Sequence, residues 1–295
     1  MVTFFQHFLN CLQLGSVYAL VALGYTMVYG IVKLINFAHG DIIMIGAYAS
    51  LQTIPLLLQT GMPLLLCVFV SILCCSLLGI VIEKIAYRPL RNAPRLCSLI
   101  TAIGMSLLLQ NLAQLLFSSN PKPFPSVFST SALQIGGVKT SVNTVLTILV
   151  SIILMILLYL YTKFTSSGRA MRCVSEDLGA ARLMGINVNR TITVTFAIGS
   201  ALAAIASVFY ANTYPIVEPT MGSQLGLKAF IAAVLGGIGI IPGAMLGGIL
   251  MGLAEGLSRA YIDSRVADAV VFGILILVLL FKPSGLLGKN VREKV

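Results

Sequence analysis

Charged residues are scarce in this sequence. Only 9% of its 295 residues are charged and 58% are hydrophobic, whereas a soluble domain carries roughly 25% charged residues because its surface faces water. Several stretches of about 20 residues hold almost no charge, enough to cross a hydrocarbon core of about 30 Å. They include Met62–Ile82, Val145–Tyr161 and Val266–Phe281. This shortage excludes a soluble protein and predicts a polytopic membrane protein.

The sequence also lacks the common motifs of nucleotide binding and catalysis. A P-loop is missing, because Gly288-Lys289 has Pro283 and Asn290 at the positions where the GxxxxGK[ST] motif needs glycine and a hydroxyl residue. GxSxG and HExxH are missing too. We therefore expect that the chain is not an enzyme, binds no metal or cofactor of its own, and needs a separate subunit for any ATP-driven role.

Cysteine pairs are absent as well. None of the six cysteines shows CxxC spacing, so we expect buried free thiols. The net charge of +10 could indicate a nucleic-acid partner. The basic residues stand in short loops between apolar runs, however, and that pattern reports orientation in a membrane. We therefore expect lipid around the chain and no nucleic acid.

The apolar pattern predicts an all-α, polytopic integral membrane protein with eight or nine transmembrane or re-entrant helices. All of them belong to a single transmembrane domain over residues 1–295. The two segments between 225 and 258 are short and meet at Pro242-Gly243, so they form either two short helices or one re-entrant hairpin. The expected segments are 4–32, 40–59, 63–86, 97–117, 143–163, 191–213, 225–241, 242–258 and 266–282.

The basic residues predict the orientation. Fourteen of the 19 Lys and Arg residues fall on one side of these segments, which the positive-inside rule makes cytoplasmic. The N-terminus then lies outside and the C-terminal tail inside. The fourteen are Lys33, Lys84, Arg88, Arg91, Arg95, Lys163, Arg169, Arg172, Arg182, Arg190, Lys282, Lys289, Arg292 and Lys294.

Two connecting loops are long. The external loop, 118–142, contains the run Ser118–Pro125, which is too rich in proline for a helix. It is either a solvated connector or a docking place for a soluble partner.

The cytoplasmic loop, 164–190, contains signals for a short helix. Ser175 can cap it, and Glu176 and Asp177 suit its first turn. Arg182 suits its last turn and Gly185 its left-handed stop. We expect one helix over residues 176–184, about 13 Å long. It either makes a mechanical contact with a partner or lies on the bilayer surface.

Glycines recur at four-residue spacing near the C-terminus. In lipid, small residues allow helices to approach closely, so these positions predict tight packing. The packed pair either moves beside a pathway or is static. The glycines are Gly239, Gly243, Gly247, Gly248, Gly252 and Gly256.

Few ionisable or polar side chains fall within the spans, and each is a functional candidate because burial in a membrane is costly. Asn36, His39 and Asp41 form the densest cluster. We expect it at the cytoplasmic end of the first two spans, where it is either part of an inner gate or an ordinary polar turn. Lys33 could pair with Asp41 there.

Glu255 lies deeper in its segment and could pair with Arg259 at i, i+4. Lys228 at the outer end of its span can extend its ammonium to the interface. From these residues alone the protein is a transporter or a channel. An ion-coupled secondary transporter would use Asp41 or Glu255 as its coupling carboxylate, and a passive channel would need no coupling helix.

Several blocks resemble one known family. Ile35–Asp41 with Gly46–Tyr48, Gly168–Arg172, Glu176–Ile186 and Gly236–Ala244 are similar to the branched-chain amino-acid ABC transporter permease family. The closing Lys282–Leu286 fits too. The blocks follow the family order over nearly the whole chain, and the length resembles the shorter, high-affinity-system permease type.

The resemblance implies a channel-forming permease subunit of an ATP-binding-cassette importer in a bacterial inner membrane, with branched-chain (hydrophobic) amino acids as substrates. Its implied partners are a longer paralogous permease, two cytoplasmic ATPases that hold ATP and Mg, and a periplasmic amino-acid-binding protein. The coupling contact with the ATPase then falls on Glu176, Asp177, Ala181, Arg182 and Gly185. Permeases for urea or short-chain amides share much of this pattern and are the alternative.

Overall fold

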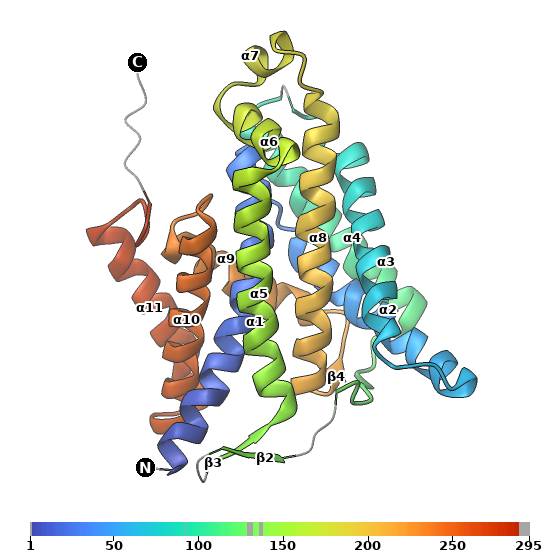
Figure 1. The fold of residues 1–295 in the computed structure, drawn as a ribbon, viewed down its shortest axis with the longest axis vertical. Helices are drawn as coiled ribbons and strands as arrows, with labels where there is room; N and C mark the ends of the chain where they lie inside the picture. The colour runs from blue at the N-terminus through green and yellow to red at the C-terminus, as the bar shows by residue number, and fades with distance from the viewer. Residues whose placement is uncertain (1, 92, 129–131, 136–137, 289–295) are drawn as a thin grey trace.

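The protein is a bundle of long apolar helices, seen here in a computed structural model that describes residues 2–91, 93–128, 132–135 and 138–288 (Figure 1). Within those residues, eight helices are long and apolar enough to cross a membrane, and a ninth apolar helix, α9, is shorter. This confirms the polytopic all-α fold. The eight are α1 (Val2–Val32), α2 (His39–Thr60), α3 (Leu66–Ile82, continued by the π-helical turn η1, Glu83–Tyr87), α4 (Arg95–Phe117), α5 (Val142–Phe164), α8 (Val188–Thr213), α10 (Ile241–Tyr261) and α11 (Ser264–Phe281).

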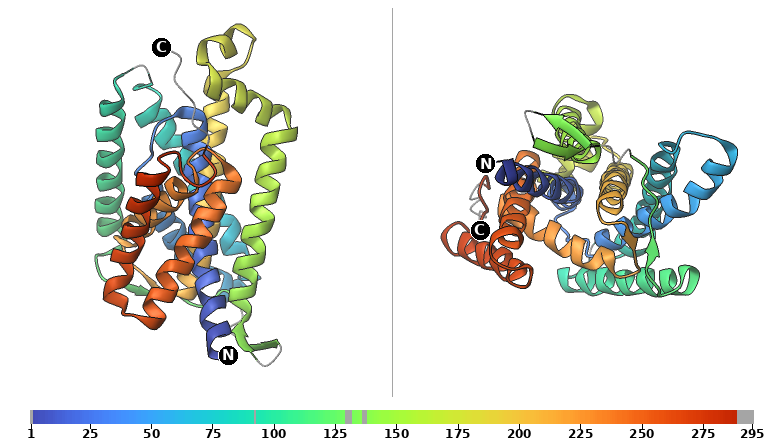
Figure 2. Two further views of the ribbon diagram at one scale, coloured as in Figure 1. Left: turned by 90° about the vertical axis from the view of Figure 1, so that its left-hand side faces the viewer. Right: turned by 90° about the horizontal axis from the view of Figure 1, so that it is seen from below.

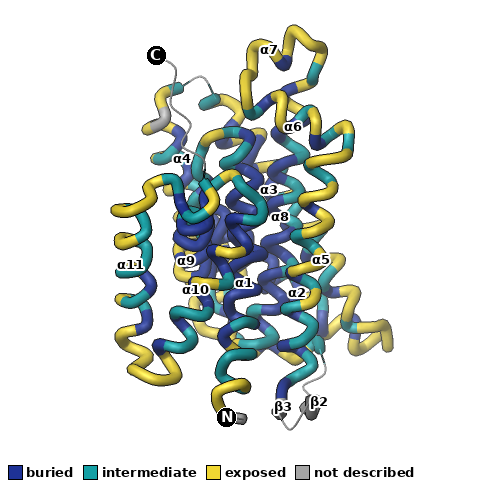
Figure 3. The backbone as a smooth tube through the Cα atoms, turned by 60° about the vertical axis from the view of Figure 1, so that its left-hand side comes forward, coloured by how far each residue is buried: buried dark blue, intermediate teal, exposed yellow. Residues whose placement is uncertain are grey.

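Helix α1 lies in the centre of the bundle, and its middle is completely covered by its neighbours (Figure 3). The outer helices α4, α5 and α11 instead expose large apolar side chains. Leu115 and Phe281, for example, are 82% and 87% exposed. In water such a surface would aggregate. In lipid it is the expected surface, since the backbone polar groups along the body of each helix are paired within that helix.

The two ends of the bundle differ (Figure 1). One end carries the start of α1 and four short strands. Strand β1 (Lys122–Pro123) pairs antiparallel with β4 (Ile216–Val217), and β2 (Ala132–Ile135) pairs with β3 (Val138–Ser141). The other end carries two short helices, α6 (Ser166–Glu176) and α7 (Leu178–Leu183). Of the fourteen residues assigned to the basic side, Lys289, Arg292 and Lys294 lie outside the described residues.

The single helix expected over 176–184 is wrong, because the chain breaks at Asp177. Its backbone is extended (φ −151°, ψ 118°), and its side chain accepts hydrogen bonds from the N–H groups of Gly179 and Ala180 at 2.6 and 2.9 Å. Asp177 is thus the N-cap of α7, whereas Glu176 ends α6. An aspartate favours this role over a place inside a helix, since its carboxylate competes for nearby backbone N–H groups.

The expected position of the Asn36–Asp41 cluster is also wrong. After α1 the chain turns at Lys33 (φ 57°) and runs back into the bundle, so that α2 begins beside the last third of α1. A Cβ added to Gly24 would lie 2.4 Å from Nε2 of His39. Gly24 stands eight residues before the end of α1, which places the start of α2 about 12 Å below that end. The segment between α1 and α2 therefore turns back into the bundle, and α2 itself is one continuous helix.

The expected pair of short segments near the C-terminus forms two separate helices, α9 (Met221–Gly236) and α10. Seen from below, α9 runs obliquely across the bundle instead of along it (Figure 2, right). Gly237 and Gly239 form the corner between the two helices with φ of 108° and 92°, values that favour glycine.

Candidate functional site

Two helices begin inside the bundle and meet at their N-termini. A Cβ added to Gly222 of α9 would lie 2.3 Å from the carbonyl oxygen of Gly40 in α2, and one added to Gly226 would lie 2.7 Å from the Cα of Gly40. Only glycine allows this approach. The positive ends of two helix dipoles therefore lie side by side at membrane depth.

Asp41 follows directly after this contact and forms the centre of a polar cluster. The residue is 1% exposed, and its Oδ1 accepts a hydrogen bond from Nε2 of Gln110 in α4 at 2.9 Å. The same nitrogen lies 2.9 Å from Oγ of Ser223 and 3.1 Å from Oγ of Ser106. Among the described residues no salt bridge includes Asp41, so its expected pair with Lys33 is absent.

The cluster opens onto a polar face of the bundle. Ser223 and Gln224 of α9 and Asn111 of α4 are exposed, and the side chain of Asp268 in α11 is 49% exposed. Helices α4, α9 and α11 lie along the same side of the bundle (Figure 2, right). Lipid tails cannot satisfy such groups, so this α4–α9–α11 face requires water or another protein chain against it.

Glu255 is the centre of a second, charged cluster. It is fully buried and accepts hydrogen bonds from the hydroxyl of Tyr18 and the ammonium of Lys228, both at 2.7 Å, and from the guanidinium of Arg259. Lys228 also contacts Asp268 at 2.7 Å. Two cations thus face two carboxylates, and the formal charge of the cluster is zero.

The ion pair of Glu255 with Arg259 follows from their i, i+4 spacing on one helix, but the ion pairs of Lys228 do not follow from any spacing. Lys228 is 7% exposed and buried between α9, α10 and α11, so the expectation that it extends to the interface is wrong. Its partner Glu255 is on another helix, 27 residues along the chain. No local pattern could have found this contact.

His39 and Asn36 face away from Asp41. The ring of His39 is 1% exposed and stands 4.6 Å from the ring of Tyr25 in α1. Oδ1 of Asn36 accepts a hydrogen bond from the hydroxyl of Tyr87 at 3.0 Å. The four gate candidates therefore lie in three different places. Asn36 and His39 pack in the turn before α2, and Asp41 faces α4. Glu255 lies in the charged cluster.

The C-terminal glycines pack against two different helices. Gly243 and Gly247 face α9, where added Cβ atoms would lie 2.5 Å from the oxygen of Gly236 and 2.1 Å from that of Ala232. Gly248, Gly252 and Gly256 face α1 instead, where the corresponding Cβ atoms would lie 2.1 to 2.4 Å from the nearest atoms. Gly239 stands apart at the corner, with a Cβ position 3.5 Å from Gly30.

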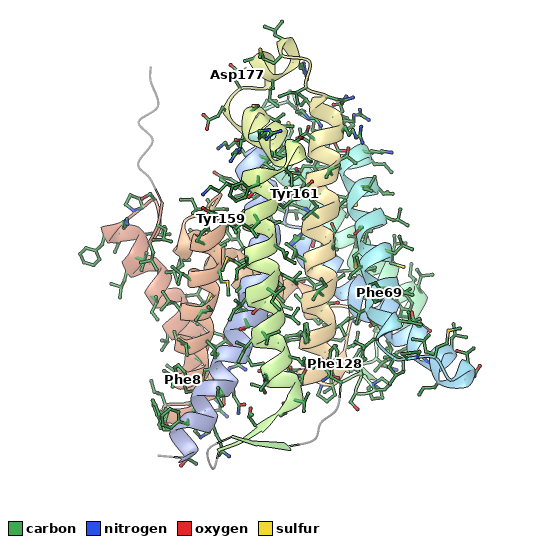
Figure 4. The ribbon with its side chains drawn as sticks, viewed as in Figure 1. Phe8, Phe69, Phe128, Tyr159, Tyr161 and Asp177 are labelled. Atoms are coloured by element: carbon green, nitrogen blue, oxygen red, sulfur yellow. The ribbon has the colours of Figure 1, made fainter. Side chains whose placement is uncertain are left out.

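Helix α7 lies at the end of the bundle opposite the start of α1, where its N-cap residue Asp177 is labelled (Figure 4). Ala181 faces inward and is 3% exposed, whereas Glu176 and Arg182 are exposed. Leu183 and Met184 at the tip are 91% and 82% exposed. Gly185 ends the helix with φ of 78°.

A buried ion pair connects this end to the membrane helices, and the sequence analysis missed it. Glu83 in η1 is 0% exposed and contacts Arg91 at 2.9 Å. The hydroxyl of Thr193 in α8 donates to Glu83 at 2.8 Å, and Arg91 also donates to the side-chain oxygen of Asn189 at 2.7 Å. Burial lowers the pKa of Arg91, and the nearby Glu83 carboxylate opposes that shift. The segment that follows α7 is thereby joined to α3.

Comparison with known proteins gives a consistent result. Residues 7–280 match the family described as "Branched-chain amino acid transport system / permease component". The chain is 46% identical to the high-affinity branched-chain amino acid transport system permease protein LivH of Escherichia coli (strain K12), over 99% of this chain and 98% of that protein. It is also 46% identical to the corresponding protein BraD of Pseudomonas aeruginosa, with the same coverage. The solved structure of PsaBC from Streptococcus pneumoniae in complex with Fab matches 93% of this chain and 91% of that chain, at 14% identity and a TM-score of 0.47.

Proposed function

The chain belongs to the family of branched-chain amino acid transport system permease components, and we propose from this premise that it forms one half of the translocation pathway of an ATP-binding-cassette importer for branched-chain amino acids. Near-full-length identity to LivH and BraD favours this substrate class over urea or short-chain amides. The protein is a multi-pass membrane permease, and such a permease works with ATPase and substrate-binding subunits in general.

The observation that carries the proposal is the exposed apolar tip of α7. Leu183 and Met184 are 91% and 82% exposed at the end of the bundle that carries α6 and α7. Burial of each side chain in a groove of a partner would contribute roughly 2 kcal/mol. In this proposal Glu176, Asp177, Ala181, Arg182 and Gly185 form or shape the contact with a cytoplasmic ATPase, and ATP with Mg is bound there and not by this chain.

The structure offers a route for the mechanical coupling. Closure of the ATPases on ATP would push α7, and the push would reach α8 through the short segment after Gly185. The Glu83–Arg91–Asn189 contacts join α8 to α3 at that end. The α3–α8 pair would tilt as a unit, because Thr193 and Asn189 of α8 are hydrogen-bonded to the two members of the Glu83–Arg91 ion pair at the end of α3.

We place the amino-acid pathway along the α4–α9–α11 face, with the longer paralogous permease on its other side. The polar residues of this face suit a water-filled route between two chains, and Asp41 is its buried carboxylate without a cation. The ammonium group of a passing amino acid supplies the missing charge. In the charged cluster, by contrast, Glu255 already faces Lys228 and Arg259, so it has no free charge for an ion-coupled transport cycle.

The orientation is also part of the proposal. The α6–α7 end carries most of the basic residues and would face the cytoplasm. The end with the start of α1 and strands β1 and β4 would face outside, where a periplasmic binding protein would dock. This orientation predicts that a protease or a thiol reagent added from outside does not reach Cys173 in α6, which is exposed at the opposite end.

The proposal is tested by co-purification. Changing Leu183→Asp and Met184→Asp together should abolish co-elution with co-expressed ATPase subunits of a branched-chain amino acid importer, and ATP-dependent leucine uptake in proteoliposomes should stop. Met62→Asp is the matched control, because Met62 is 53% exposed at the opposite end. If the tip variant keeps its ATPase, the coupling role is wrong. If the wild-type chain alone moves leucine without ATP, the chain is a secondary transporter.

A further inference from the structure

A cavity of about 420 Å³ lies near the α6 end of the bundle and plays no part in the proposed pathway. It is bounded by α1, α5, α6 and the corner between α9 and α10. Tyr159, one of its lining residues, marks its level on α5 (Figure 4). Helix α5 lies on the side of the bundle opposite the α4–α9–α11 face (Figure 2, right).

The cavity has a charged rim and an apolar interior. Lys163 and Arg172 stand at the rim, and Met27, Ile31 and Ile241 line the interior. Arg172 donates a hydrogen bond from Nη2 to the carbonyl oxygen of Lys163 at 3.2 Å, which holds the two cations on the same edge. All the lining residues are described, and none of them is acidic. In the part of the chain that the structure describes, neither cation takes part in a salt bridge.

Thr26 supplies a second, independent sign of a ligand. It lines the cavity and is 1% exposed, and its hydroxyl has no hydrogen-bond partner among the residues that the structure describes. A buried hydroxyl without a partner costs on the order of 1 to 3 kcal/mol. Thr26 stands six residues before the end of α1, so this hydroxyl lies about 9 Å deeper than the helix end.

We propose that this cavity binds an anionic phospholipid from the adjacent leaflet. Its phosphate lies between Lys163 and Arg172, the ester region reaches the Thr26 hydroxyl, and the first part of an acyl chain packs on Met27, Ile31 and Ile241. Basic pockets between transmembrane helices bind acidic headgroups in this way. An amino acid does not fit, since its ammonium group would find two cations and no carboxylate. A soluble anion would leave the apolar interior unused.

A lipid in this position contacts several elements of the protein at once. It contacts α6, which leads to α7, and also α1 and the glycine corner at Gly239. Its presence would therefore stiffen the base of the α6–α7 arm. This inference does not depend on the identity of the transported substrate.

The test measures lipid affinity of the full-length chain, purified together with the subunits that accompany it. Native mass spectrometry follows a titration with phosphatidylglycerol and with phosphatidylcholine of the same acyl chains. The double variant Lys163→Gln/Arg172→Gln should bind phosphatidylglycerol roughly tenfold more weakly. The control Lys84→Gln/Arg190→Gln removes two exposed basic residues of the same end that do not line the cavity, and it should bind like the wild type.

Two further measurements keep the test decisive. Thr26→Val keeps both charges and nearly the same shape, so it separates a lost hydroxyl contact from a folding defect, and it should weaken binding severalfold. A hundredfold excess of inorganic phosphate should not displace the lipid. The proposal would be overturned if the cavity double variant bound phosphatidylglycerol as tightly as the control variant does. It would also be overturned if the wild type bound phosphatidylcholine as tightly as phosphatidylglycerol, or if phosphate displaced the bound lipid.

Discussion

Loss of the Lys228 side chain should destabilise the protein strongly. It stands 2.7 Å from both Glu255 and Asp268, and its side chain is 9% exposed. Lys228→Met keeps the aliphatic length but leaves Glu255, which is fully buried, with Arg259 and Tyr18 as its donors. Removal of one partner from a buried pair costs about 3 to 5 kcal/mol. We expect about 3 kcal/mol here, the lower end, because two donors remain.

The assay is reversible unfolding by sodium dodecyl sulfate in mixed micelles, followed by circular dichroism. The matched control is Arg265→Met, an exposed cation at the start of α11, which should change the free energy of unfolding by less than about 0.5 kcal/mol. Glu255→Gln combined with Lys228→Met removes both charges. This double variant should recover at least about 1 kcal/mol relative to the sum of the single changes.

Either of two results would refute this reasoning. If Lys228→Met costs less than about 1 kcal/mol, the ion pair is not isolated from water as its burial indicates. If the double variant is additive, Lys228 and Glu255 do not interact in the folded protein in solution.

Three other predictions follow from the site and the packing. Gly252→Ala should destabilise the protein by roughly 1 to 3 kcal/mol, because the added Cβ would lie 2.1 Å from Gly15. Gly273→Ala should instead stabilise α11 by roughly 0.5 to 1 kcal/mol, because its Cβ would stand in open space. Thermal unfolding of the two variants tests both predictions. Asp41→Asn keeps the hydrogen bond from Gln110 but loses the charge, so leucine uptake in proteoliposomes should fall at least tenfold while the unfolding temperature stays within a few degrees; unchanged uptake would remove Asp41 from the pathway. Glu176→Lys with Arg182→Glu should reduce ATPase co-elution on size exclusion, since both side chains are exposed on the α6–α7 arm, and full co-elution would show that the contact is not electrostatic.

The predictions from sequence that succeeded concern features within one helix. The spans follow from runs of apolar residues, the pair of Glu255 with Arg259 follows from i, i+4 spacing, and the left-handed Gly185 follows from its place after a helix end. The start of α7 is a local feature, but the sequence predicted one helix over residues 176–184 with Ser175 as its cap and no break at Asp177. Both Ser175 and Asp177 can cap a helix, and only the backbone conformation at Asp177 decides between them.

The placement of charges required the folded chain. Asp41 was expected beside Lys33 at a helix end, but the re-entrant turn puts it next to Gln110, 69 residues away. The turn is possible because Gly24, Gly40 and Gly222 leave room for neighbouring helices. Glycine spacing predicts close approach of helices, yet it does not say which helix approaches.

By itself the sequence determined that this protein is a polytopic helical membrane protein, because hydropathy and loop charge act on each span independently of the others. The word permease came from the motif blocks that resemble a known family. Only the tertiary structure decided which buried charges are neutralised and which are not. Glu255 meets Lys228 across two helices, whereas Asp41 meets an amide and has no cation beside it in the described part of the chain. In a membrane interior, where water cannot screen a charge, that difference separates a structural carboxylate from a candidate contact for the substrate.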